Sequence, residues 1–311
     1  MTLGSRGLAA VLVMGTLALA AVTPVVALST PGPAPGRVEV LDAGPPVRPA
    51  SGRPAAVGTA PPLSWLVPAP TGWAPAATAA IRPGLLTETA GGGRCTSNFV
   101  FVAGERRFLG QAAHCAGTGV ATETDGCASG TRPLGTAVVV QAADGSRHTG
   151  RLAYSSWIAM QGRGETDPRA CAHNDFALVE LAPADHRLIN PSLPVLGGPT
   201  GLRVGGPPAG EPVFGYGGPG PKPGTAGRGV GAGFGHEIYT VSPGAPGESG
   251  SAFVDADGAA FGVLVTLNLS ARPVSNGATD LAAALAYANT HGGIGAVTLA
   301  LGTEPFRPSA G

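Results

Sequence analysis

Short β-prone runs, interrupted at close intervals by glycine, proline and aspartate, make up most of the chain after residue 91. Runs of this kind, bounded by turn-forming residues, predict strands rather than long helices. They fall into two sets, which are 97–103, 108–112, 136–141, 149–158 and 176–181, and then 211–216, 237–241, 251–255 and 259–269. A Pro/Gly-rich passage separates the sets and indicates a connector. The pattern therefore predicts two antiparallel β units joined by a linker.

One helix is expected near the end of the chain, over residues 279–291. Leu281, Leu285 and Ala288 recur there at helical spacing, and Gly292 follows as a terminator. A single late helix beside two sets of strands favours an all-β fold class.

The first residues predict an export signal. Arg6 provides a positive charge, residues 8–22 are apolar, and the small residues ending at Ala27 are typical of a cleavage site. We expect a signal peptide over residues 1–27; an uncleaved membrane anchor is the alternative, because the apolar stretch nearly reaches spanning length. Export would place the chain outside the cell, where four cysteines favour two disulfides.

Residues 28–90 have a biased composition, with Pro, Ala and Gly at 33 of 63 positions. Such a segment has few large apolar side chains whose burial could offset the entropy cost of ordering. We therefore expect a disordered pro-region or tether, with Trp65 and Trp73 as possible docking points and order beginning near Gly91. A spacer with no role in folding is the alternative.

Charge and motif content exclude several functions. The 19 basic and 19 acidic residues balance, so no overall field attracts nucleic acid or an anionic membrane. No Cys-x-x-Cys or clustered His/Asp/Glu pattern indicates zinc, and the turn 255–258 fits a hairpin better than a calcium loop. The glycine-rich run 215–235 lacks a Gly-Lys-Ser/Thr ending, so a mobile surface loop is expected there instead of a phosphate loop. No cofactor and no metal are expected.

A serine between glycines stands at the start of an apolar run, in the stretch Gly247-Glu248-Ser249-Gly250-Ser251. Flanking glycines allow a sharp turn that exposes the hydroxyl and lets nearby N–H groups converge on one spot. Such groups stabilise the oxyanion of an acyl-transfer intermediate. A plain turn is the competing interpretation in a chain with 51 glycines.

A base and an acid that could act with Ser249 stand elsewhere in the chain. His114 lies where an apolar strand meets glycine-rich chain, next to Cys115. Asp175 opens a strongly apolar strand, so its carboxylate is expected to be partly desolvated and suited to orienting an imidazole. His173, two residues before this acid, is expected to be an exposed loop residue.

Three motifs together resemble the chymotrypsin/trypsin-like serine proteases, in that family's chain order, and the variant resembles its exported bacterial branch. They are Ala-Ala-His114-Cys, Asn-Asp175-Phe-Ala-Leu and Gly-Glu-Ser249-Gly-Ser. The resemblance covers roughly residues 92–306. It implies two antiparallel six-stranded β-barrels with the active site in the cleft between them and a C-terminal helix. The barrels would occupy residues 91–190 and 211–306, joined by a linker at 191–210.

The resemblance also implies roles for individual residues. Ser249 would be the nucleophile, His114 the base and Asp175 the residue that orients it, with the amides of Gly247 and Ser249 as the oxyanion hole. Cys95 and Cys115 match the family's bridge beside the base. Cys127 and Cys171 remain, and would tie a loop to the approach to Asp175.

Two departures from the family concern activation and specificity. Glu248 stands where the family often has an aspartate that receives a freed N-terminus, yet no matching cleavage junction lies near Gly91. The specificity pocket would involve Pro243, Thr266 and Asn268, none of them acidic, so a small, apolar or mildly polar residue is expected at the cleaved position. A glutamate preference is the alternative if His236 or Thr266 reaches the pocket.

The sequence thus predicts a secreted, monomeric serine endopeptidase that acts on peptides or proteins through an acyl-enzyme intermediate. No nucleic-acid partner and no stable membrane association after signal cleavage are expected. Two alternatives use the same residues. One is a protein of this fold that binds peptides without turnover, and the other is a hydrolase of acyl esters.

Overall fold

The computed structural model describes residues 72–120, 124–218, 220–268 and 273–308. The predicted signal peptide and the predicted spacer up to residue 71, including Trp65, lie outside these residues. Within the described ranges, no helix has the length and apolar character needed to cross a membrane.

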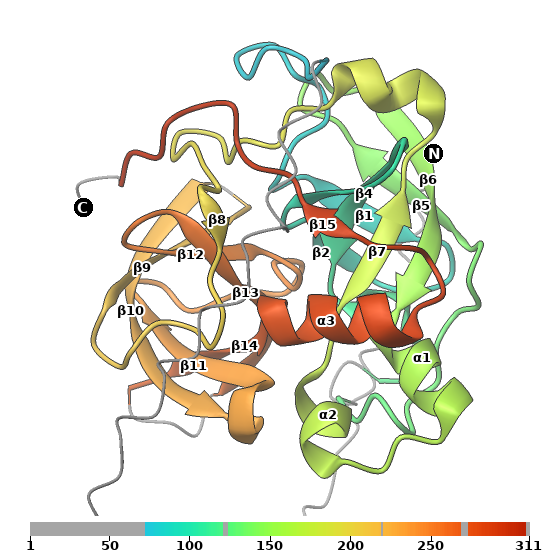
Figure 1. Cartoon of the computed structure of the whole chain (residues 1–311), viewed down its shortest axis with the longest axis vertical. Helices are drawn as coiled ribbons and strands as arrows, with labels where there is room; N and C mark the ends of the chain where they lie inside the picture. The colour runs from blue at the N-terminus through green and yellow to red at the C-terminus, as the bar shows by residue number, and fades with distance from the viewer. Residues whose placement is uncertain (1–71, 121–123, 219, 269–272, 309–311) are drawn as a thin grey trace, which may run out of the picture. The chain divides into compact units, whose positions relative to one another are not determined.

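The first sheet has the strand order β15-β3-β4-β7-β6-β5-β1-β2. Its strands are β1 Leu86–Thr89, β2 Arg94–Thr96, β3 Val100–Ala103, β4 Arg106–Gln111, β5 Ala137–Gln141, β6 Arg147–Ser155, β7 Ala177–Glu180 and β15 Thr298–Leu299. Three residues separate β2 from β3, and they carry the pairing onward: Ser97 N donates to Leu85 O on one side and Asn98 N to Gly110 O on the other. Residues 97–99 thus bond both to the residue just before β1 and to β4, which stand at different places in the strand order. The sheet therefore curls (Figure 1).

The second sheet has the order β12-β9-β10-β11-β14-β13-β8. Its strands are β8 Gly201–Leu202, β9 Pro212–Gly217, β10 Gly220–Val230, β11 Gly235–Thr240, β12 Ala252–Asp255, β13 Ala259–Asn268 and β14 Ser275–Asp280. Pairing of β12 with β13 closes six of these strands into a barrel. The all-β, two-barrel fold class is confirmed.

The predicted late helix is α3, Leu281–His291. The carboxylate of Asp280 accepts a hydrogen bond from Ala283 N and so caps its first turn. Leu281 and Leu285 are buried in a core cluster that also holds Phe176 beside the first sheet and Val263 of the second. Figure 1 shows α3 running past both sheets, so its apolar face joins them.

The chain is ordered earlier than the sequence predicts. Residues 72–90 belong to the fold, since β1 pairs with β5 and the side chains of Ile81 and Leu85 are buried in the first unit. Trp73 packs against the same cluster rather than on another molecule. The Pro/Ala-rich composition of the segment drew attention away from these few apolar residues. They are enough to order residues 72–90 because strands from the rest of the chain surround them. The predicted boundary at residue 90 is wrong.

The described residues of the glycine-rich run 215–235 belong mainly to strands, chiefly β10, and not to the expected surface loop. β10 pairs with β9 over residues 220–225 and with β11 over residues 224–230. On the β11 side the strand register begins only at Gly224, after both Pro221 and Pro223, and there Pro223 takes part only as an acceptor, its O bonding Val241 N at 3.1 Å, which needs no N–H. At Gly224 a side chain would collide with the carbonyl of Tyr239 on β11, so close strand approach requires glycine there. Neighbouring strands outweigh weak local propensity.

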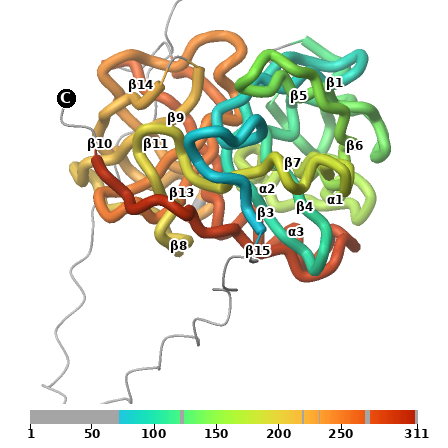
Figure 2. Tube along the Cα trace, turned by 90° about the horizontal axis from the view of Figure 1, so that it is seen from above, coloured from blue at the N-terminus to red at the C-terminus, as the bar shows by residue number. Residues whose placement is uncertain are grey.

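Several boundaries also differ from the prediction. The expected strand 149–158 ends at Ser155, where α1, Ser156–Arg163, begins. A second helix, α2 Pro168–His173, was not predicted, and Thr279 lies within β14, which ends at Asp280, instead of starting a helix. The C-terminal segment returns to the first sheet as β15 beside β3 (Figure 2).

Candidate active site

His114 and Asp175 form a close pair where β4 ends and β7 begins, two neighbouring strands inside the first sheet. His114 lies in a short 3-10 helix, Ala113–Ala116, directly after β4, and Asp175 lies between α2 and β7. Its Oδ2 is 2.6 Å from His114 Nδ1, and its Oδ1 accepts a hydrogen bond from His114 N at 2.9 Å. The carboxylate therefore fixes both the backbone and the ring of the histidine. With Nδ1 donating to Asp175, Nε2 is left as a proton acceptor.

The electrostatics of the pair set the basicity of His114. Burial lowers the pKa of His114, but the charge of Asp175 and the hydrogen bond to it act together in the opposite direction and leave the pKa above its ordinary value. Asp175 is itself only 4% exposed. The carboxylate therefore stabilises an imidazolium, the state that forms when the histidine accepts a proton.

The second sheet helps to hold Asp175. The hydroxyl of Thr279, on β14, accepts a hydrogen bond from Asp175 N at 3.2 Å and donates to His173 O at 2.7 Å. On the other side, the hydroxyl of Ser156 bridges Asn174 O and Phe176 N. Sequence reasoning missed Thr279, because its only local signal was the start of an apparent helix.

The loop that carries Ser249 is built on two glycines with positive φ. Gly247 and Gly250 both have a φ of 93°, which side-chain-bearing residues rarely adopt. The first sheet holds this loop through Thr96, whose hydroxyl donates to Gly247 O at 2.8 Å and whose amide donates to Ser249 O at 2.8 Å. Asn98 adds a side-chain bond to Gly250 O. The interpretation of this stretch as a sharp turn is thus consistent with its backbone.

Ser249 and His114 line the same cleft, which has a volume of about 770 Å³. Its lining combines residues 91–95 and 117–120 of the first unit with residues 244–247 and 264–267 of the second. Among the described residues, no hydrogen bond joins Ser249 Oγ to His114, and the amides of Gly247 and Ser249 have no acceptor. These two N–H groups are therefore available to an oxygen bound in the cleft.

Glu248, beside the nucleophile candidate, has a partner that the sequence did not reveal. Both of its carboxylate oxygens lie 2.6 Å from the ammonium of Lys222 on β10. Lys222 is the sole lysine of the chain, a signal that could have suggested a dedicated role. The pair joins the Ser249 loop to the second barrel.

The predicted pocket residues are only partly placed at the cleft. Thr266 lines it, whereas the lining includes neither Pro243 nor Asn268. His236, on which the glutamate alternative partly depended, does not line the cleft either; it is buried on β11 with its Nε2 2.8 Å from Asp280. His236 lies opposite Ala278 in the β11–β14 pairing, a placement that residue spacing alone could not show.

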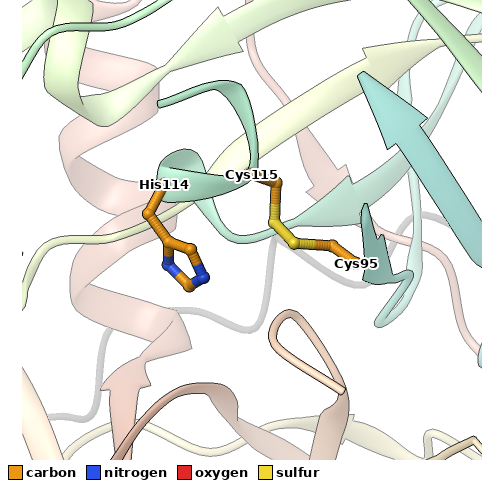
Figure 3. Close-up of side chains that lie close together, drawn as sticks. All are labelled: Cys95, His114 and Cys115. Carbon is orange, nitrogen blue, oxygen red and sulfur yellow. A yellow bond between two sulfur atoms is a disulfide. The ribbon is translucent and has the colours of Figure 1, made fainter. Parts of the chain in front are cut away.

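Both predicted disulfides are present, the one that the resemblance implies and the one left by the remaining two cysteines. Cys95 bonds to Cys115, and Figure 3 shows this bridge next to the ring of His114. Cys127 bonds to Cys171. This bridge joins the loop that follows the 3-10 helix of His114 to α2, the helix that ends two residues before Asp175. The two His/Cys/Asp groups with metal-like spacing in the described ranges contain these same cysteines, so they offer no thiolate to a metal.

No family model and no curated protein matches the chain. Among solved structures it is similar to protease A of Thermobifida fusca, with 17% identity, 72% of this chain and 100% of that one covered, and a TM-score of 0.46. The Nocardiopsis protease is 18% identical, with 70% of this chain and 98% of that one covered and a TM-score of 0.42. A glutamic-acid-specific serine protease is also 18% identical, with 70% of this chain and 100% of that one covered and a TM-score of 0.44. Because these identities and TM-scores are low, the fold is assigned from the strand arrangement of this chain alone.

The strand arrangement of this chain is sufficient to assign its fold. One curled sheet and one closed six-stranded barrel face a shared cleft, α3 packs against both, and the histidine, aspartate and serine motifs occur in that order along the chain. The described part of the chain therefore has the chymotrypsin-like two-barrel fold, the fold of the serine proteases that its motifs resemble.

Proposed function

We propose that this chain is a serine endopeptidase that acts through Ser249, His114 and Asp175. The observation that carries the proposal is the joint placement of three features on one cleft: the His114–Asp175 pair, the hydroxyl of Ser249, and the two amides without an acceptor. Binding alone needs none of these features in combination, whereas acyl transfer uses all of them.

The proposed reaction follows from this geometry. Ser249 Oγ bonds to the carbonyl carbon of the substrate while its proton passes to His114 Nε2, and the oxyanion lies against the amides of Gly247 and Ser249. The C–N bond then breaks, and His114 returns the proton to the leaving amine. Water repeats the sequence on the acyl-enzyme, releasing the acid and restoring Ser249. Asp175 stabilises the imidazolium at both stages.

We further propose a secreted, monomeric enzyme without a cofactor. The two disulfides support an oxidising compartment, because such bonds rarely persist in the cytosol. The predicted signal peptide supports export. Its substrate would be a peptide or protein lying across the cleft between the two sheets.

Labelling by a fluorophosphonate, together with hydrolysis of casein and a peptide library, tests the proposal. Labelling and peptide cleavage are expected in the full chain and lost in Ser249→Ala, while Ser146→Ala, a matched change at an exposed hairpin serine, leaves both intact. Folded protein that is not labelled would instead indicate a binding protein. Labelling with turnover of esters alone would indicate an ester hydrolase.

A further inference from the structure

Two segments beside Ser249 form one wall of the cleft. They are residues 244–247, which lead into the nucleophile, and residues 264–267 of β13, whose Leu264 O accepts a hydrogen bond from Gly250 N at 2.6 Å. None of the side chains in these two segments carries a charge. A substrate side chain that enters between them therefore meets apolar side chains, backbone and, at Thr266, an uncharged hydroxyl.

Gly244 and Leu264 end this space. Both residues line the cleft, and both also line a second hollow of about 10 Å³ that contacts Lys222, Glu248 and Asn276. They are therefore the partition between the two spaces. A Cβ placed on Gly244 would lie 3.1 Å from Leu264 Cδ2, so the leucine already rests against the glycine backbone.

The partition is held from both sides. Gly244 N donates to Asn276 Oδ1 at 2.7 Å, which fixes the glycine. Leu264 is 7% exposed and packs in a core cluster with Phe253, Phe261 and Ile238. A side chain that pushed Leu264 aside would have to disturb this cluster, and cores resist added volume.

We propose that Leu264 closes the side-chain pocket of the cleft and restricts the cleaved position to glycine or alanine. This inference rests on the proposed function and names its substrate class. Larger apolar residues would collide with Leu264, and charged residues would lose water without gaining a partner. The residue at the cleaved position is the one whose carbonyl Ser249 attacks.

Peptide p-nitroanilides that differ only in the last residue, which is glycine, alanine, leucine or phenylalanine, test the proposal. The full chain is expected to favour alanine over phenylalanine by more than about tenfold in kcat/KM, as pockets discriminate by single methylene groups. Leu264→Ala opens the partition toward the second hollow, and is expected to lower this ratio by about tenfold or more. Leu134→Ala, a matched change at an exposed site outside the cleft, leaves the ratio unchanged.

Gly244→Ala keeps the test decisive if Leu264→Ala does not fold. Gly244 has no positive φ, so its backbone accepts alanine, but the methyl would lie 3.1 Å from Leu264 Cδ2 and 3.2 Å from Asn276 Oδ1. Leu264 must therefore shift to admit it, which changes the closed end of the pocket. We expect the alanine substrate to lose rate relative to glycine. A wild-type preference for leucine or phenylalanine, or an unchanged ratio in folded Leu264→Ala, would overturn the inference. Fluorophosphonate labelling of the same samples separates that result from failure of the proposed function.

Discussion

The ammonium of Lys222 lies 2.6 Å from each carboxylate oxygen of Glu248, the residue immediately before Ser249. Glu248 is 8% exposed, and one of its oxygens also accepts a hydrogen bond from Ala245 N at 2.7 Å. In the family that the motifs resemble, an acid at this place often receives a freed N-terminus. Here a side chain of β10 provides the positive charge, so Glu248 has a cation without any cleavage of the chain.

Replacing Lys222 by methionine is expected to weaken both stability and activity. The substitution leaves Glu248 as a poorly solvated carboxylate without a partner, and breaking a buried pair from one side costs about 3–5 kcal/mol. Residues 245–248 would lose their anchor, so the amides of Gly247 and Ser249 would no longer be held in place. Urea denaturation measures the first effect, and the rate of fluorophosphonate labelling measures the second.

Two further variants separate charge from packing at this pair. Lys222→Met combined with Glu248→Gln removes both charges and is expected to recover part of the lost free energy of unfolding. Arg228→Met removes a highly exposed cation from the same strand and should change neither measurement. Labelling of folded Lys222→Met at the wild-type rate would show that the ion pair does not support the loop.

The pH dependence of hydrolysis is expected to follow His114. The histidine acts as a base only when neutral, and its pKa is raised, so kcat/KM should fall on the acidic side at a pH above the ordinary histidine value. Asp175→Asn removes both influences that raise this pKa and leaves burial, which lowers it. The acidic limb should therefore move to lower pH while kcat/KM falls by roughly 10⁴. A pH–rate profile with an unmoved limb would contradict this assignment.

Local sequence pointed to the candidate residues of the site but not to the residues that support them. His114, Asp175 and Ser249 each stand in a short motif whose residue types suit the task, so they could be recognised without knowing the fold. Lys222 and Thr279 act through strand pairings that bring distant positions together, and nothing beside them in the sequence marks that contact. Prediction of the strands was limited in the same way. β10 has weak strand propensity of its own and forms because β9 and β11 pair with it on its two sides.

Thr279→Val is expected to loosen Asp175 with little change of shape. The hydroxyl accepts a hydrogen bond from Asp175 N and donates one to His173 O, while Asp175 N also donates to His173 O at 3.1 Å. Its loss therefore removes two hydrogen bonds but leaves the amide one acceptor, a cost of about 0.5–1.5 kcal/mol per bond. We expect a lower free energy of unfolding and a smaller kcat/KM, both read against Thr290→Val, an exposed threonine of α3. Equal values for the two variants would remove Thr279 from the support of the acid.

The bridge between Cys127 and Cys171 is expected to stabilise the approach to Asp175 as well as the fold. The two cysteines are 44 residues apart, so the chain-entropy model gives a contribution of about 4 kcal/mol. Replacing both by serine should lower the free energy of unfolding by that order. It should also reduce kcat/KM, because α2 would lose its tie to the loop before residue 131. If activity at a temperature where the variant is fully folded matched that of the wild type, the bridge would serve stability alone.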